Sequence, residues 1–180
     1  MKRAGRTATR NGTDHASPAR LARVLHREFV LFPPIDIAQV SGLLGIGVQM
    51  RELPPDVSGF YTATPAGRAV IVLNAAMPES RQRFTWAHEL GHHLLETDDC
   101  PGEVSPDDDA QKRACDAFAV ELLMPADAVR SRLVSLRGKP LRSMLDSLQA
   151  TFGVSREAIL NRLDDLDLWP VWREISRATE

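Results

Sequence analysis

Long apolar runs are missing from this sequence of 180 residues. No stretch approaches the roughly 18 consecutive apolar residues of a membrane-spanning helix, and the basic start is not followed by the apolar segment that export requires. Cysteine is scarce as well, because only Cys100 and Cys115 occur and one pair builds no disulfide framework. We therefore expect a cytoplasmic protein with no membrane partner.

An excess of basic charge is also missing. The 22 Lys and Arg residues are balanced by 24 Asp and Glu residues, which gives a net charge of −2. A protein that coats nucleic-acid phosphates ordinarily carries a strong basic excess, so we expect no direct nucleic-acid binding. The length and the 43% hydrophobic content suit one domain with a buried core.

The chain divides into a basic tail at residues 1–16, one domain at 17–170 and a charged tail at 171–180. Ser17 followed by Pro18 is a typical helix start, and Pro65 with Gly67 separates two short β-prone segments. The predicted fold is α+β, with a small antiparallel sheet packed against several helices. We expect helices at 17–32, 35–44, 80–96 and 110–123, strands at 59–62 and 69–73, a polar loop at 97–109 and two or three short helices beyond residue 125.

The segment most informative about function is His-Glu-x-x-His (HExxH) at residues 88–92, within the predicted helix 80–96. Residues four apart lie on one face of a helix, so His88 and His92 can bind one Zn²⁺ together. Glu89 lies beside that position, where a carboxylate can take a proton from water and return it to a leaving amine. The motif predicts a single zinc ion per chain, with His88 and His92 as ligands and Glu89 as the catalytic base.

Gly91 lies inside this predicted helix, where glycine is unfavourable by about 1 kcal/mol. Its presence indicates that a second backbone, either a strand or another helix, passes very close. A catalytic zinc site ordinarily has three protein ligands, and the predicted helix 110–123 is the obvious source of the third.

The sequence resembles the ImmA/IrrE family of metallopeptidases. The resemblance rests on residues 81–92 and 118–125, supported by the strand residues 71–74 and the closing stretch 152–163, all in the expected order. It covers the chain from about Ser17 to Trp169. It implies a zincin-like single domain that acts as a cytoplasmic zinc endopeptidase on a helix-turn-helix repressor.

The third ligand departs from the family pattern, because Lys112 stands where the resemblance implies a ligand glutamate. A lysine ammonium has no lone pair for zinc. Asp116, one turn further along the same helix face, is the first replacement; its ordinary family role would be support of a histidine. Asp109, one turn before Lys112, is the alternative, and Cys115 is a further candidate that also suits a small buried position.

Lys112 also keeps a different class of function open. A chain with a weak or missing metal site would be a catalytically inactive family member. Such a protein would bind and neutralise a repressor or toxin partner without cleaving it.

Overall fold

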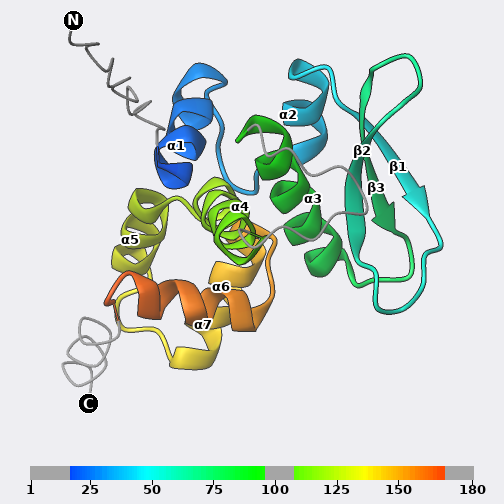
Figure 1. Cartoon of the computed structure of the whole chain (residues 1–180). Coiled ribbons are helices and arrows are strands. Elements are labelled where there is room, and N and C mark those ends of the chain that lie inside the picture. Colours follow the sequence, from blue (N-terminus) through cyan, green and yellow to red (C-terminus); the bar gives the residue numbers. More distant parts are fainter. Residues whose placement is uncertain (1–16, 96–107, 169–180) are drawn as a thin grey trace, which may run out of the picture.

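The computed structural model describes residues 17–95 and 108–168 (Figure 1). Over these residues the chain is an α+β domain of seven helices and three strands, as the sequence predicts. The tails at 1–16 and 171–180, and most of the predicted loop 97–109, lie outside the described residues. In chain order the elements are α1 (Pro18–Glu28), α2 (Ile37–Leu43), β1 (Gly47–Arg51), β2 (Gly59–Ala63), β3 (Ala69–Asn74), α3 (Glu79–Leu94), α4 (Asp108–Leu123), α5 (Ala126–Ser135), α6 (Leu141–Phe152) and α7 (Arg156–Asp165).

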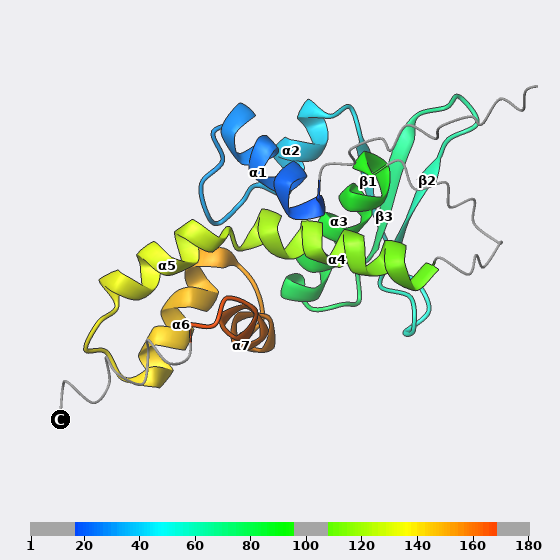
Figure 2. The same cartoon turned by 60° about the vertical axis from the view of Figure 1, so that its left-hand side comes forward.

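Helices α3 and α4 form the centre of the molecule. The sheet packs on α3, α4 packs on α3 and α1, and α5, α6 and α7 lie on the side of α4 away from the sheet (Figures 1 and 2). The buried side chains form one continuous core rather than two, so the site built on α3 has a rigid support. Its largest members include Ile71, Leu73, Leu90, Phe118, Leu122, Met144, Leu148 and Phe152.

The helix starts follow from local sequence signals. The Ser17 hydroxyl accepts a hydrogen bond from the Arg20 N–H, and Pro18 occupies the first helical position of α1. Asp36 caps α2 in the same way through the Gln39 N–H. Among the described helices, none combines the length and the apolar character that crossing a membrane requires.

The two predicted strands pair antiparallel as expected, but the sheet is mixed because a third strand, β1, which is not predicted from the sequence, adds to it in parallel. The strand order is β1-β3-β2, with β2 antiparallel to β3 and β1 parallel to it. The tight turn between β2 and β3 makes that pair antiparallel, and β1 can then reach β3 only along its other edge. The central position of β3 explains why residues 70–74 are all buried, as expected for the most apolar strand.

Gly91 is the point of closest approach between α3 and α4, which confirms the expected second backbone. A Cβ at this position would lie 3.2 Å from the Cys115 Cα and 3.2 Å from the Phe118 Cδ1. Because the first of these atoms belongs to the α4 backbone, it cannot turn away as a flexible side chain would. Gly91 therefore sets how near α4, and Cys115 with it, lies to the motif on α3.

We expect alanine substitution of two helical glycines to have opposite effects. Gly42→Ala in α2, where a Cβ has nothing within 4 Å, should stabilise the fold by up to about 1 kcal/mol through helix propensity alone. Gly91→Ala should instead destabilise it by about 1 kcal/mol, because overpacking costs more than the propensity gained. Urea unfolding of both variants checks this, and equal stabilisation of both would show that α3 and α4 are not in tight contact.

A buried ion pair fastens α7 to α4. Arg162 pairs with the Glu121 carboxylate and donates from Nε to the Met124 carbonyl at 3.0 Å. The second oxygen of Glu121 accepts from Arg23 of α1 at 3.3 Å. Both members of the buried pair therefore have their charges and hydrogen bonds satisfied inside the protein. Glu121 thus holds three helices together and faces away from the motif.

Candidate metal centre

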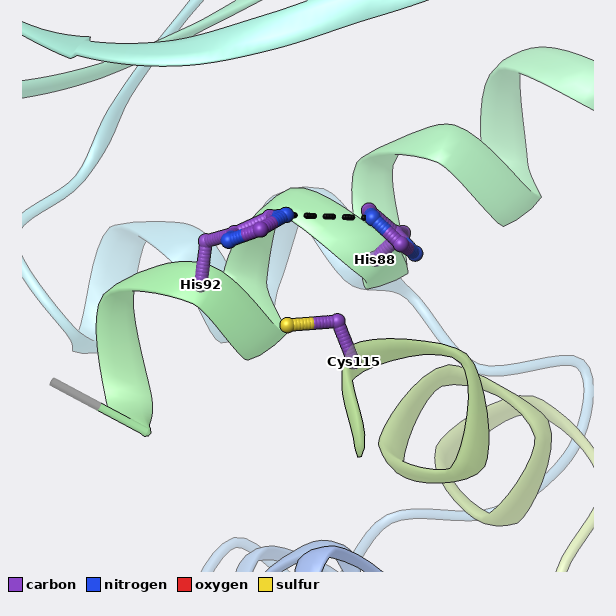
Figure 3. Close-up of side chains that lie close together, drawn as sticks. All are labelled: His88, His92 and Cys115. Carbon is purple, nitrogen blue, oxygen red and sulfur yellow. Dashed lines mark hydrogen bonds between the residues drawn. The ribbon is translucent and has the colours of Figure 1, made fainter. Parts of the chain in front are cut away.

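The two motif histidines lie one turn apart on α3 with their rings edge to face. The Nε2 atoms of His88 and His92 are 3.1 Å apart (Figure 3). Two nitrogens bound at 2.0–2.1 Å to one tetrahedral zinc would be about 3.3 Å apart. The imidazoles are therefore already at the separation that a shared metal ion requires.

A third donor reaches the same place from α4. Cys115 is fully buried, and one ligand atom from each of His88, His92 and Cys115 lies within 4.8 Å of the others. Figure 3 shows the Cys115 side chain directed from α4 toward the helix that carries both histidines. Imidazole nitrogen and thiolate sulfur are both ordinary ligands of zinc, and a catalytic zinc site has three protein ligands, so the donor chemistry fits the metal that the motif predicts.

Asp116 contacts the opposite side of the His88 ring. Its Oδ1 lies 2.8 Å from the His88 Nδ1. A carboxylate there fixes the proton on Nδ1, which leaves the Nε2 lone pair directed at the metal position. Because the two ring nitrogens point in different directions, this contact makes Asp116 an orienting partner of His88.

Asp109, the remaining ligand candidate from the sequence, is exposed, and so is Lys112. Asp109, in the first turn of α4, lies about 9 Å along the helix axis from Cys115 and is not in the three-residue donor group. Lys112 lies one turn before Cys115 and lines a pocket that opens onto the site. Cys115 lies three residues after Lys112, the position at which the family resemblance implies a ligand glutamate. This spacing places the Cys115 thiol on the same face of α4 and is the sequence signal that points to it.

Glu89 is the most buried acid of the site, with 8% of its surface exposed. Burial raises its pKa to about 7, although a hydrogen bond from the Tyr61 backbone acts in the opposite direction by favouring the charged form. A carboxyl group whose pKa is near neutrality can both accept and release a proton at physiological pH. Glu89 is thus suited to proton transfer beside the two histidines.

The raised pKa of Glu89 predicts a pH-dependent stability difference in the metal-free protein. The fold favours the protonated form of Glu89. The stability that this preference contributes is lost as the pH rises from about 4.5 through 7. Glu89→Gln carries no ionisable group at this position and does not lose this stability. The difference in free energy of unfolding between the variant and the unchanged protein should therefore shift in favour of the variant by about 3 kcal/mol between pH 4.5 and pH 8. Urea unfolding in the presence of a chelator measures this, and an advantage that does not change with pH would contradict it.

A pocket of about 450 Å³ opens beside these residues. His88 and Glu89 of α3, Gly59 of β2 and Lys112 of α4 all line it. The pocket therefore offers a peptide direct access to Glu89 and to His88.

The buried side chain of Asn74 shapes the loop that completes this pocket. The Asn74 amide nitrogen donates to the carbonyls of Leu53, Pro54 and Val57, and its oxygen accepts from the Leu53 N–H and the Ala76 N–H. A buried amide that is fully hydrogen-bonded in this way holds its loop firmly. The wall formed by residues 56–58 is thereby fixed in place.

Tyr61 ties the edge strand to the motif helix. Its hydroxyl is 2.9 Å from the His93 Nδ1, and the two rings are in tilted contact. Together with the backbone contact to Glu89, this holds β2 against α3.

The chain is similar to known proteins in sequence and in fold. Residues 43–164 match the Peptidase M78 family, described as an IrrE N-terminal-like domain. No curated protein matches the chain. Among solved structures, a Mycobacterium tuberculosis transcriptional regulator is similar, with a TM-score of 0.60 and 19% identity over 81% of this chain and 46% of that one. That likeness concerns the fold alone, and the chain spans less than half of that protein's length.

Proposed function

Since the chain belongs to the IrrE N-terminal-like family of peptidases, we propose that it is a zinc-dependent endopeptidase acting in the cytoplasm on a protein partner. One observation carries the proposal. The Nε2 atoms of His88 and His92 are 3.1 Å apart, and buried Glu89, with its pKa near 7, lies between them in the chain. This combination suits hydrolysis better than structural metal binding, because a structural site has no use for a proton-transfer group.

We assign the metal to His88, His92 and Cys115. Asp116 is the partner that orients His88, in place of the ligand role that the sequence predicts for it. Zinc bound there would activate water and polarise the scissile carbonyl. Lys112 is compatible with this site because its exposed ammonium remains hydrated, which weakens its repulsion of the metal.

Glu89 performs the proton transfers. It takes a proton from the attacking water and then delivers it to the departing amine nitrogen. The hydrogen bond from the Tyr61 backbone positions the Glu89 carboxyl group for these steps. Its near-neutral pKa matches both directions of transfer.

The edge of β2 that does not pair with β3 is the surface along which the substrate would lie. The backbone groups of Ser58 and Thr64, which flank β2, bond toward β3. The direction of the backbone groups alternates along a strand, so the odd-numbered residues between them direct their N–H and carbonyl groups to the opposite edge. Gly59 on that side lines the site pocket. An extended peptide that adds to this edge would bring its own backbone across the pocket and past Glu89.

The partner we propose is a helix-turn-helix repressor, the substrate class that the ImmA/IrrE resemblance implies. The similar solved structure is named a transcriptional regulator, which is compatible with a role in transcription. The test is to incubate the zinc-loaded protein with candidate repressors and to measure intact masses. Defined fragments support the proposal.

The presence of Lys112 in the lining of the site pocket supports one rival function. A catalytically inactive member would form a stable complex with the repressor or a toxin and leave both chains whole. Co-purification of an intact partner, with no fragments after zinc is added, would favour this rival over the peptidase.

A further inference from the structure

A second, larger cavity adjoins the site pocket. It has a volume of about 640 Å³ and lies between α3, α4 and α7. Arg81, Phe84 and Asp116 line both spaces, so the two are neighbours. Since Asp116 also contacts the His88 Nδ1 at 2.8 Å, the cavity begins one side chain away from the proposed metal. Its volume far exceeds what one amino-acid side chain occupies.

The lining of this cavity is mixed, and one part of it is apolar. Phe84 of α3, Val120 and Met124 of α4 and Ala158 of α7 all line it. None of these four side chains carries a charged or titratable group that would favour a polar occupant. Such a surface accommodates an alkyl chain, including the methylene stem of lysine or arginine, which commonly packs on apolar surface with its head group in water.

The exposed part of the lining, which we call the rim, carries two acidic side chains that the described part of the protein does not neutralise. Glu157 and Asp165 are exposed and form no ion pair or hydrogen bond with any described residue. The two lie about 12 Å apart along one face of α7. The nearby Arg162 is already paired with Glu121, and Arg81 donates to the Ser58 hydroxyl on the side of the site pocket. An apolar floor with an unpaired acidic rim is complementary to a long cationic side chain.

We propose that this cavity is a specificity subsite for a lysine or arginine of the protein substrate, a few residues at most from the scissile bond. This inference rests on the proposed peptidase function. The stem packs on Phe84, Val120 and Met124, and the cationic head meets Glu157 or Asp165. Proteins that read DNA carry lysine and arginine on their binding surface, so the subsite suits the class of partner proposed above.

The test uses zinc-loaded protein carrying Glu89→Gln, which binds peptides without cleaving them. An array of ten-residue peptides is prepared in matched sets that differ at one position, occupied by Lys, Arg, norleucine or Glu. Binding of the Lys and Arg peptides should exceed that of the norleucine peptide by about five-fold. Adding Glu157→Gln and Asp165→Asn together should reduce this preference to less than about two-fold.

Asp164→Asn is the matched control, because Asp164 is exposed on the same turn of α7 but does not line the cavity. It should leave the preference for basic peptides unchanged. A preference that is missing, that survives the double substitution, or that is lost equally in the control would overturn the subsite. Circular dichroism of each variant establishes that α7 remains folded.

Cleavage of the same peptides by protein with Glu89 intact separates this inference from the proposed function. A basic preference in binding without any cleavage supports the subsite and counts against the peptidase. Cleavage with no preference for basic residues supports the peptidase and overturns the subsite.

Discussion

Replacing Glu89 by glutamine should slow cleavage of the protein partner by about 10²–10⁴-fold, the range that general acid–base catalysis contributes. The side chain keeps its size and its place in the fold, but it can no longer accept the proton of the attacking water. Zinc content should stay at the level of the unchanged protein, because Glu89 is not among the three proposed donors. The loss of rate should therefore appear without a loss of metal.

The control for this variant is Glu79→Gln. Glu79 lies on the first turn of the same helix, is exposed and lines none of the described pockets. Its replacement should leave the cleavage rate within about two-fold, as is usual for surface changes distant from a site. Timed mass spectrometry of the partner provides both rates. Unchanged cleavage by Glu89→Gln would remove Glu89 from the mechanism.

Replacing Cys115 by alanine should weaken zinc binding by more than about 100-fold, since loss of an orienting partner alone costs about 10–100-fold. Asp116→Asn should show that smaller loss, because the amide still contacts His88 while its charge is gone. Competition with a chelating dye measures both affinities without any need for a substrate. The ligand assignment therefore predicts a larger loss of zinc affinity in Cys115→Ala than in Asp116→Asn.

Cobalt provides an independent measure of the same assignment. Protein loaded with Co²⁺ should show a near-ultraviolet band from the Cys115 thiolate, absent in Cys115→Ala and retained in Asp116→Asn. If Asp116→Asn instead lost more metal affinity than Cys115→Ala and the band were missing, the carboxylate would be the third ligand, as the sequence predicts.

The central helices were predictable because their signals are local. The apolar spacing and the HExxH motif define α3 within a few residues, and Gly91 indicates a close neighbour before that neighbour is known. The family match extends over the same residues, in agreement with the resemblance seen in the motifs. Local patterns of this kind depend on positions a few residues apart, so they can be read from the chain alone.

The identity of the third donor was not predictable in the same way. Cys115 and Asp116 are neighbours on α4, and consecutive residues on a helix differ by about 100° in direction. Which of them comes near both histidines depends on how α4 is rotated, and that rotation follows from packing at Gly91 and Phe118. The sheet presents the same difficulty, since the parallel pairing of β1 with β3 joins segments about twenty residues apart.

Elemental analysis of the purified protein for zinc tests the metal centre most directly, with His92→Ala as the comparison. Removal of one imidazole leaves His88 and Cys115 as the only donors of the proposed set. We predict about one zinc per chain in the unchanged protein and a near-complete loss in His92→Ala. A protein that holds no zinc even after zinc is added back, or a variant that holds as much as the parent, would contradict the metallopeptidase account.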